Sequence, residues 1–211
     1  MRAKIKLYNQ DCMEAMKDMA DNQFDLAIVD PPYGINISKQ TMGRGSGNDL
    51  GRHKRKSWDN NIPDSLYFQE LKRISAEQIL WGGNYYLEHL GSSRCFLLWD
   101  KIDYNSDFAS HEMAWTSFNK NTKCFRRART LRDDLKVKIH PTQKPVALYK
   151  WLLQNYAKEG DKILDTHLGS GSIAIACWDL KFDLTGYELD KEYYDGAVKR
   201  FNIHCKQGQL F

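Results

Sequence analysis

The stretch 24-FDLAIVDPPYG-34 decides the fold of this 211-residue chain. Residues 26–29 form an apolar, partly β-branched run of the length expected for a fully buried strand. The strand must end at Asp30, because the two prolines that follow cannot donate hydrogen bonds to a neighbouring strand. The residue before each proline is also held in an extended conformation. The Asp30 carboxylate and the Tyr33 ring are therefore predicted at the carboxyl end of a buried strand, where open α/β sheets bind ligands.

Strand and helix patterns alternate along the chain on both sides of this stretch. Residues 4–9 alternate into a short strand, and residues 12–19 place three methionines at helical spacing after Asp11, a helix N-cap. Together with the strand at 24–33 they form strand–helix–strand, the unit that builds parallel sheets. The predicted fold class is α/β, with a doubly wound, mostly parallel sheet. Further strands are expected at 78–86, 94–101, 112–118, 161–166 and 184–189, and further helices at 63–76, 146–156, 172–179 and 191–201.

The composition restricts the function classes. Hydrophobic residues make up 42% and charged residues 27% of the chain, as in ordinary globular proteins. The net charge of +4 permits a nucleic-acid partner without requiring one. The five cysteines contain no C-x-x-C pair, so we expect reduced thiols and neither a zinc site nor a disulfide framework. Because no segment resembles a signal peptide or a membrane span, a cytoplasmic protein is expected.

Two basic segments interrupt the alternating pattern. Residues 35–61 are rich in glycine, serine and charge and lack an apolar period, so a long mobile loop is predicted there. Residues 120–139 contain a second cluster of basic side chains. We interpret the chain as one domain, 1–211, with both segments as insertions that contact nucleic acid; solvated loops without a partner are the alternative. The candidate contacts are Arg44, Arg52, Lys54, Arg55, Lys56, Lys101, Arg126, Arg127 and Arg129.

A second motif lies late in the chain, between a strand and a helix. Residues 169–174 read G-x-G-x-x-A, in which glycines let a ligand approach the backbone and the helix N-terminus offers N–H groups. Glu188 ends the next strand, near the spacing of an acid that binds ribose hydroxyls. NAD-binding proteins share this pattern, and close helix packing alone would also explain the glycines. An NAD enzyme, however, normally has this loop in its first strand–helix turn, whereas here one strand and one helix follow it.

Three motifs together resemble a known family. DPPY at 30–33, HPTQKP at 140–145 and LGSGS at 168–172, in this order, look like the β-class DNA amino-methyltransferases. These are circularly permuted S-adenosylmethionine-dependent enzymes whose catalytic motif precedes the cofactor motif. The resemblance covers nearly the whole chain except 35–57 and the tail. The family usually has Pro-Phe where this chain has Thr166 and His167, which leaves the packing at that edge of the cofactor open.

The resemblance implies a Rossmann-like, circularly permuted fold with an inserted target-recognition segment. It also implies S-adenosyl-L-methionine as cofactor, double-stranded DNA as partner, and a restriction-modification context without a metal requirement. In the catalytic motif Asp30, Pro31, Pro32 and Tyr33, the Asp30 carboxylate and the Pro31 carbonyl would accept the two amine hydrogens, and Tyr33 would stack on a flipped base. The recognition sequence, a nuclease partner, and the choice between monomer and homodimer are left open.

The resemblance further assigns cofactor contacts. Glu188 would hold the ribose hydroxyls, Asp11 would face the adenine amino group, and Asp165 would fix the glycine loop. The loop would line the methionine part of the cofactor, and the residues of HPTQKP would reach its carboxylate. The implied cofactor-binding residues are Asp11, Cys12, Asp30, His140, Thr142, Lys144, Asp165, Gly169, Ser170, Gly171, Ser172, Glu188 and Leu189.

The predicted activity is methyl transfer to the N6 amine of adenine in DNA. Transfer to cytosine N4 is the alternative within the same chemistry, usually indicated by serine where Asp30 stands, and RNA or protein amides are further substrates of that kind. From another class, the glycine loop would suit an NAD-binding oxidoreductase or a nucleotide-binding module. Binding of S-adenosylmethionine or of NAD separates these two classes.

Overall fold

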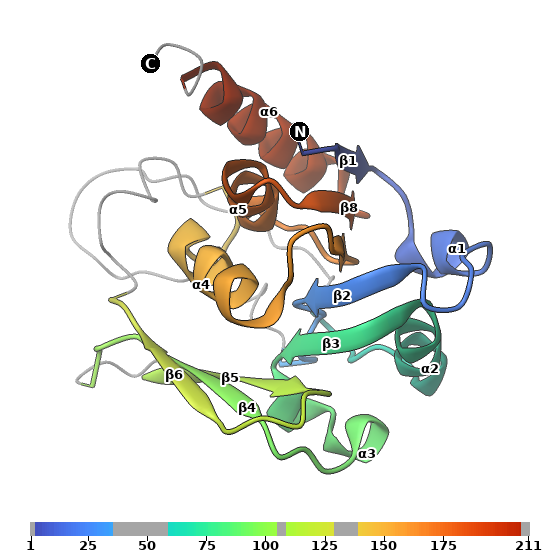
Figure 1. The fold of residues 1–211 in the computed structure, drawn as a ribbon, viewed down its shortest axis with the longest axis vertical. Coiled ribbons are helices and arrows are strands. Elements are labelled where there is room, and N and C mark those ends of the chain that lie inside the picture. The colour runs from blue at the N-terminus through green and yellow to red at the C-terminus, as the bar shows by residue number, and fades with distance from the viewer. Residues whose placement is uncertain (1–2, 36–58, 105–108, 129–138, 208–211) are drawn as a thin grey trace.

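The computed structural model describes residues 3–35, 59–104, 109–128 and 139–207 (Figure 1). Eight strands within these residues form one sheet in the order β1-β8-β7-β2-β3-β5-β4-β6. The strands are β1 (Ile5–Tyr8), β2 (Phe24–Val29), β3 (Ser75–Trp81), β4 (Phe96–Asp100), β5 (His111–Thr116), β6 (Lys123–Arg126), β7 (Lys162–Asp165) and β8 (Asp183–Tyr187). The helices are α1 (Cys12–Met16), α2 (Ser65–Ile74), η2 (Gly83–Tyr85, a 3-10 turn), α3 (Leu87–Leu90), α4 (Val146–Tyr156), α5 (Ser172–Leu180) and α6 (Lys191–Gln207).

The sheet is mostly parallel, as the strand–helix–strand pattern predicts. Strands β1, β8, β7, β2 and β3 are parallel neighbours, and β5 runs antiparallel between β3 and β4. The pairing of β2 with β7 places Asp30, which follows β2, and Asp165, the last residue of β7, at one edge of the sheet. The pairing of β1 with β8 joins the two ends of the chain, so the strand–helix units close into a circle in space.

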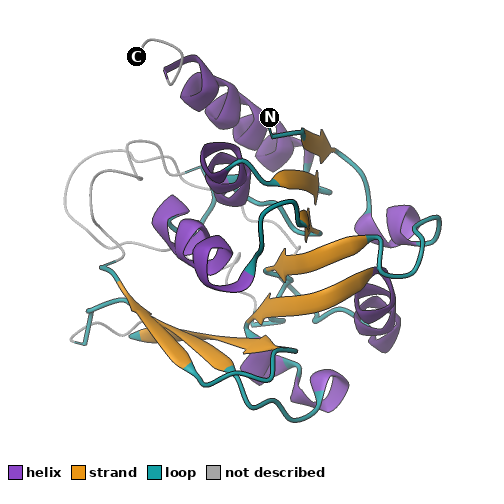
Figure 2. Cartoon of the chain, in the orientation of Figure 1, coloured by secondary structure: helices purple, strands orange, loops and turns teal. Residues whose placement is uncertain are grey.

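Helices cover both faces of the parallel half of the sheet, as Figure 2 shows. Alternate residues of β2 face opposite sides: Leu26 and Ile28 belong to the core that includes α4 and α5. Ala27 and Val29 belong to the core that includes α1 and α2. A strand that is buried on both faces must be apolar at every position. This is why 26–29 is a continuous apolar run without alternation.

Several element boundaries differ from the sequence prediction. The strand expected at 78–86 is β3, which begins at Ser75 directly after α2 and ends at Trp81. It ends there because Gly82 adopts a left-handed conformation (φ 72°), which starts the turn at 83–85. Helix α1 stops at Met16, whereas the sequence pattern extends to 19. Strand β6 was missed because 123–126 has mostly exposed side chains and was interpreted only as a basic segment.

Two further expectations can be compared with the structure. All five cysteines are free thiols, and Cys12, Cys95 and Cys177 are buried. Among the described residues, no helix combines the length and apolar character that a membrane span requires.

Candidate active site

A cavity of about 1160 Å³ opens at the carboxyl edge of the parallel strands. Its lining brings together the segments that follow β1, β2, β7 and β8, and the segment that precedes α4. Predicted site residues in the lining are Asp11, Cys12, Asp30, Pro32, His140, Thr142, Lys144, Gly169, Ser170, Glu188 and Leu189. The predicted residues Pro31, Tyr33, Asp165, Gly171 and Ser172 are not part of this lining. Four of them form hydrogen bonds with residues that are: Tyr33 with Asp30, Asp165 with His167, Gly171 with Leu168 and Ser172 with Lys144.

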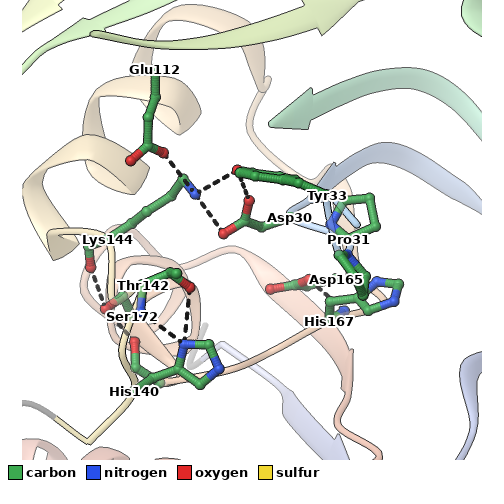
Figure 3. A network of polar contacts seen from close by, with 12 residues as sticks. Asp30, Pro31, Tyr33, Glu112, His140, Thr142, Lys144, Asp165, His167 and Ser172 are labelled. Carbon is green, nitrogen blue, oxygen red and sulfur yellow. Dashed lines mark hydrogen bonds and ion pairs between the residues drawn. The ribbon is translucent and has the colours of Figure 1, made fainter. Parts of the chain in front are cut away.

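The Asp30 carboxylate lies at the centre of a network of polar contacts (Figure 3). The Tyr33 hydroxyl donates to Asp30 Oδ1 at 2.5 Å, and Lys144 Nζ donates to Oδ2 at 2.5 Å. The backbone N–H groups of Tyr33 and Gly34 donate to Asp59 Oδ1 at 2.8 and 3.0 Å. The turn after β2 is thus held by hydrogen bonds on both sides, and both Asp30 oxygens accept one.

Lys144 is buried and does not face solvent, because its side chain is only 2% exposed. Its Nζ also lies 3.0 Å from Oε2 of Glu112, and Lys101 Nζ lies 2.7 Å from Oε1 of the same residue. Burial disfavours the ammonium of Lys144, but Asp30 and Glu112 outweigh this effect and raise its pKa above the ordinary value. For Asp30, burial raises the pKa, Lys144 lowers it and Glu112 raises it, with a net upward shift. Sequence reasoning missed Glu112 entirely.

The ring of Tyr33 packs against two aromatic neighbours and a glycine. Tyr85 stacks on it with ring centroids 5.1 Å apart, and Tyr86 approaches it edge-on. A Cβ at Gly82 would lie 2.3 Å from Tyr33 Cε1, so only glycine permits this packing. The Tyr86 hydroxyl donates to the carbonyls of Pro31 (2.8 Å) and Pro32 (2.7 Å). Since a carbonyl oxygen has two lone pairs, that of Pro31 keeps capacity for a second donor.

The glycine loop is shaped by its own backbone. Gly169 and Gly171 have φ of 51° and 70°, the left-handed region that favours glycine. The N–H of Gly169 donates to Glu188 Oε2 at 2.8 Å, and the N–H of Asp190 donates to Oε1 at 2.9 Å. The carboxylate of Glu188 is therefore fixed at the end of β8, beside the loop, at the position that the sequence pattern predicts for it.

The loop and the 140–145 segment are joined by side chains. Ser172 Oγ donates to the carbonyl of Lys144 at 2.7 Å, and Arg200 Nη1 donates to Ser172 Oγ and to the carbonyl of Ser170. Thr142 contacts His140 Nδ1, with its Oγ1 3.1 Å away. The sequence motifs HPTQKP and LGSGS, about thirty residues apart, thus form one wall of the cavity.

Asp165 and the two residues after it form a buried polar cluster. Burial raises the pKa of Asp165 to about 8, although its carboxylate accepts a hydrogen bond from the N–H of His167. Burial lowers the pKa of His167 to about 4 and so favours the neutral ring. Thr166 Oγ1 is 2.8 Å from the Tyr67 hydroxyl and 2.9 Å from His167 Nδ1. Thr166, which stands with His167 where the family usually has Pro-Phe, therefore has hydrogen-bond partners in both Tyr67 and His167.

Most of the predicted nucleic-acid contacts lie outside the described residues, namely Arg44, Arg52, Lys54, Arg55, Lys56 and Arg129. Lys101 is a different case, because it is 8% exposed and its ammonium pairs with Glu112. Its burial argues against the predicted DNA contact. Arg126 is exposed and pairs with Asp100 at 3.0 Å, and the carbonyl of Arg127 accepts from Trp99 Nε1. These two arginines lie at and just after the edge strand β6.

Residues 98–199 match the N6/N4 family of DNA methylases. The chain is 26% identical to the type II methyltransferase M.HpaI of Haemophilus parainfluenzae over 93% of this chain and 74% of that protein. It is 24% identical to M.HinfI of Haemophilus influenzae over 90% of this chain and 66% of that protein.

Two solved structures share the fold. The M1.HpyAVI–SAM complex superposes with a TM-score of 0.62 at 19% identity, covering 94% of this chain and 99% of that one. The cytosine-N4-specific PvuII DNA methyltransferase superposes with a TM-score of 0.63 at 11% identity, covering 95% and 87%. The architecture of this chain is therefore the Rossmann-like, mostly parallel arrangement that these proteins have.

Proposed function

We propose that this chain, a DNA methyltransferase of the N6/N4 family, methylates the N6 amine of adenine in duplex DNA with S-adenosylmethionine as donor. The observation that carries this proposal is one cavity lined by both the Asp30 carboxylate and the glycine loop. Its volume of about 1160 Å³ exceeds the roughly 300–1,000 Å³ usual for a single small ligand. A cofactor and a nucleobase have room to meet there.

The residues of the cavity fit S-adenosylmethionine, which supplies an electrophilic methyl group on a positively charged sulfur. Carboxylates from five positions line the cavity: Asp11, Asp30, Asp64, Glu188 and Asp190. A cationic ligand suits this lining. Asp11 Oδ1 caps α1 through the N–H of Met13, which fixes a carboxylate at the adenine end of the proposed site. Glu188, held by two backbone N–H groups, is placed to accept hydrogen bonds from ribose.

The same observations disfavour an NAD-binding oxidoreductase. A pyrophosphate carries negative charge and needs the N–H groups of a glycine loop. Here the N–H of Gly169 donates to Glu188, and that of Gly171 donates to the carbonyl of Leu168. These two N–H groups already have acceptors within the chain, and the Glu188 carboxylate beside them would repel a pyrophosphate.

In the proposed mechanism the chain positions a weak nucleophile. The lone pair of the adenine amine is delocalised into the ring, so the amine needs acceptors for its hydrogens as nitrogen becomes tetrahedral. Asp30 accepts one hydrogen and the carbonyl of Pro31 accepts the other. The amine is out of reach inside a duplex, so the base must be flipped at a cost of a few kcal/mol. Tyr85 covers one face of the Tyr33 ring, so a base could stack on that face only if Tyr85 moved away.

The order of the motifs supports a β-class, circularly permuted assignment, because Asp30 precedes the glycine loop by more than a hundred residues. The anionic side chain at position 30 supports adenine over cytosine. The likeness to a cytosine-N4-specific enzyme concerns the fold and does not bear on this choice.

The test is nucleoside mass spectrometry after reaction with cofactor that carries a deuterated methyl group. Unmethylated genomic DNA serves as substrate, because it contains every short recognition sequence. We expect label in N6-methyladenine. Label in N4-methylcytosine would contradict the adenine assignment alone, and label in RNA but not DNA would contradict the choice of DNA.

A further inference from the structure

Four charged side chains form a continuous series that ends at Asp30; Lys101 and Lys144 are buried, and Glu112 and Asp30 are partly buried. Lys101 and Glu112 come from the segment after β4 and from β5, far in sequence from the motifs. The series runs from Lys101 to Glu112 (2.7 Å), from Glu112 to Lys144 (3.0 Å) and from Lys144 to Asp30 (2.5 Å). The exposed side-chain fractions are 9%, 23%, 2% and 17% in this order. Figure 3 shows Glu112 and Asp30 on opposite sides of the Lys144 ammonium.

The position of the Lys144 ammonium is restricted further by aromatic rings. Its Nζ lies 5.4 Å from the ring centroid of Trp81 and 5.8 Å from that of Tyr33. Aromatic faces attract cations at this range. Lys144 is therefore held between two carboxylates and two rings, and it divides its charge between Asp30 and Glu112.

This division matters for the proposed chemistry. Transfer forms an N–C bond at the amine while the S–C bond breaks with its electron pair remaining on sulfur, and the amine loses one proton, for which Asp30 is the acceptor. A carboxylate in an exclusive buried ion pair with an ammonium is a weak base, because the pair stabilises its charged form. A second carboxylate on the same ammonium reduces that effect.

Resting on the proposed function, we propose that Glu112 is a positioning residue: by sharing the ammonium of Lys144, it leaves Asp30 basic enough to accept a hydrogen from the target amine. Lys101 acts in the opposite direction, since it neutralises Glu112. The Tyr33 hydroxyl touches two members of the series, since it donates to Asp30 at 2.5 Å and accepts from Lys144 at 3.2 Å. The other titratable groups near Asp30 are Tyr67, Tyr86, Tyr149 and Asp165.

A purely structural role for Glu112 makes a different prediction. If Glu112 only compensates two buried lysines, its replacement lowers stability and leaves the titration of Asp30 unchanged. The positioning role requires Asp30 to titrate at lower pH in E112Q and at higher pH in Lys101→Met. Opposite shifts from neighbouring substitutions do not follow from a loss of packing.

The first experiment needs neither cofactor nor DNA. Carbon-13 NMR titration of the aspartate carboxyls, with Asp30 assigned through D30N, measures the proton affinity of Asp30 in the whole chain. We expect the midpoint to fall by about two pH units in E112Q, for a charge that lies about 5 Å away across the Lys144 ammonium, at an effective dielectric constant near 20. We expect it to rise in K101M. An unchanged midpoint in both variants overturns the inference whether or not the enzyme methylates adenine.

The second experiment follows the methyl-transfer rate against pH. In E112Q the acidic limb of kcat should move to lower pH and the plateau should fall about tenfold, with little change in KM for the cofactor. Glu77→Gln is the matched control, because Glu77 lies near the amino end of β3, away from the Trp81–Ala114 pair beside Glu112, and accepts a hydrogen bond from Ser117. An inactive wild type would contradict the proposed function; an active wild type with an unaltered E112Q profile would contradict this inference alone. If E112Q does not fold, the direction of the K101M shift decides.

Discussion

Replacing Asp165 by asparagine should stabilise the protein, and the gain should grow with pH. Burial raises the pKa of this carboxyl from 3.8 to about 8. In the unfolded chain the group ionises near pH 4, whereas in the folded state it keeps its proton until about pH 8. Because the folded-state pKa is the higher one, the stability contribution of Asp165 is complete below pH 4 and is lost as pH rises toward 8.

The magnitude follows from the two pKa values. Each pKa unit corresponds to about 1.4 kcal/mol. At pH 7, ionisation of this carboxyl therefore stabilises the unfolded chain by about 4 kcal/mol relative to the folded state. Asparagine does not titrate and keeps the oxygen that accepts from the His167 N–H. The stability difference between D165N and wild type should therefore increase by roughly 1.4 kcal/mol for each pH unit between 5 and 8.

Urea denaturation at pH 5, 6, 7 and 8, followed by circular dichroism, measures this difference. The slope against pH is the informative quantity, because loss of the carboxyl's own contacts adds a constant offset at every pH. A difference that does not vary with pH would show that Asp165 is ionised in the folded state, and the reasoning from its burial would then be refuted.

Three further predictions follow from the site. Asp30→Ala should abolish methyl transfer while cofactor affinity, measured by isothermal titration, stays near that of wild type; transfer near the wild-type rate would contradict the catalytic role. Gly82→Ala should reduce kcat strongly, because the added Cβ displaces Tyr33 and the left-handed backbone costs about 1–2 kcal/mol. Gly160→Ala is the control: it also has a left-handed backbone (φ 91°) but has open space around the added Cβ, so it should lower stability without affecting kcat. Replacing Arg52, Lys54, Arg55 and Lys56 by alanine should reduce the salt dependence of DNA binding by up to about 0.9 in log–log slope for each phosphate contact; an unchanged slope would remove these residues from the interface.

The parallel half of the fold was predictable because its signals are local. Residues 26–29 form an unbroken apolar run since both faces of β2 are covered, and two prolines end it. The glycine loop is recognisable because Gly169 and Gly171 need left-handed backbone. The antiparallel half gave weaker signals. Strand β6 has mostly exposed side chains and lies at an edge, so its periodicity is weak and its pairing with β4 depends on tertiary contacts.

Part of the site could not be read from the sequence. Glu112 has no motif around it and reaches Lys144 only because β5 pairs antiparallel with β3, which sets Ala114 opposite Trp81. Lys101 appears in the sequence as a charge near a strand end, a position that favours a surface contact. The carboxylate that pairs with its ammonium is that of Glu112, on the neighbouring strand β5, so the pairing between strands determines which charges meet.

Acidic side chains gather at the carboxyl edge of the parallel strands. The adjacent strands β1, β8, β7 and β2 end at or within three residues before an acid: Asp11, Glu188, Asp165 and Asp30 respectively. Four carboxyls at one edge repel each other unless charge is removed or compensated. The structure does both, since burial raises the pKa of Asp165 to about 8 and Lys144 compensates Asp30. Asp11 and Glu188 line the cavity. An edge arranged in this way favours a cationic ligand at its centre and an amine next to Asp30, which is the pairing of reactants that methyl transfer from a sulfonium requires.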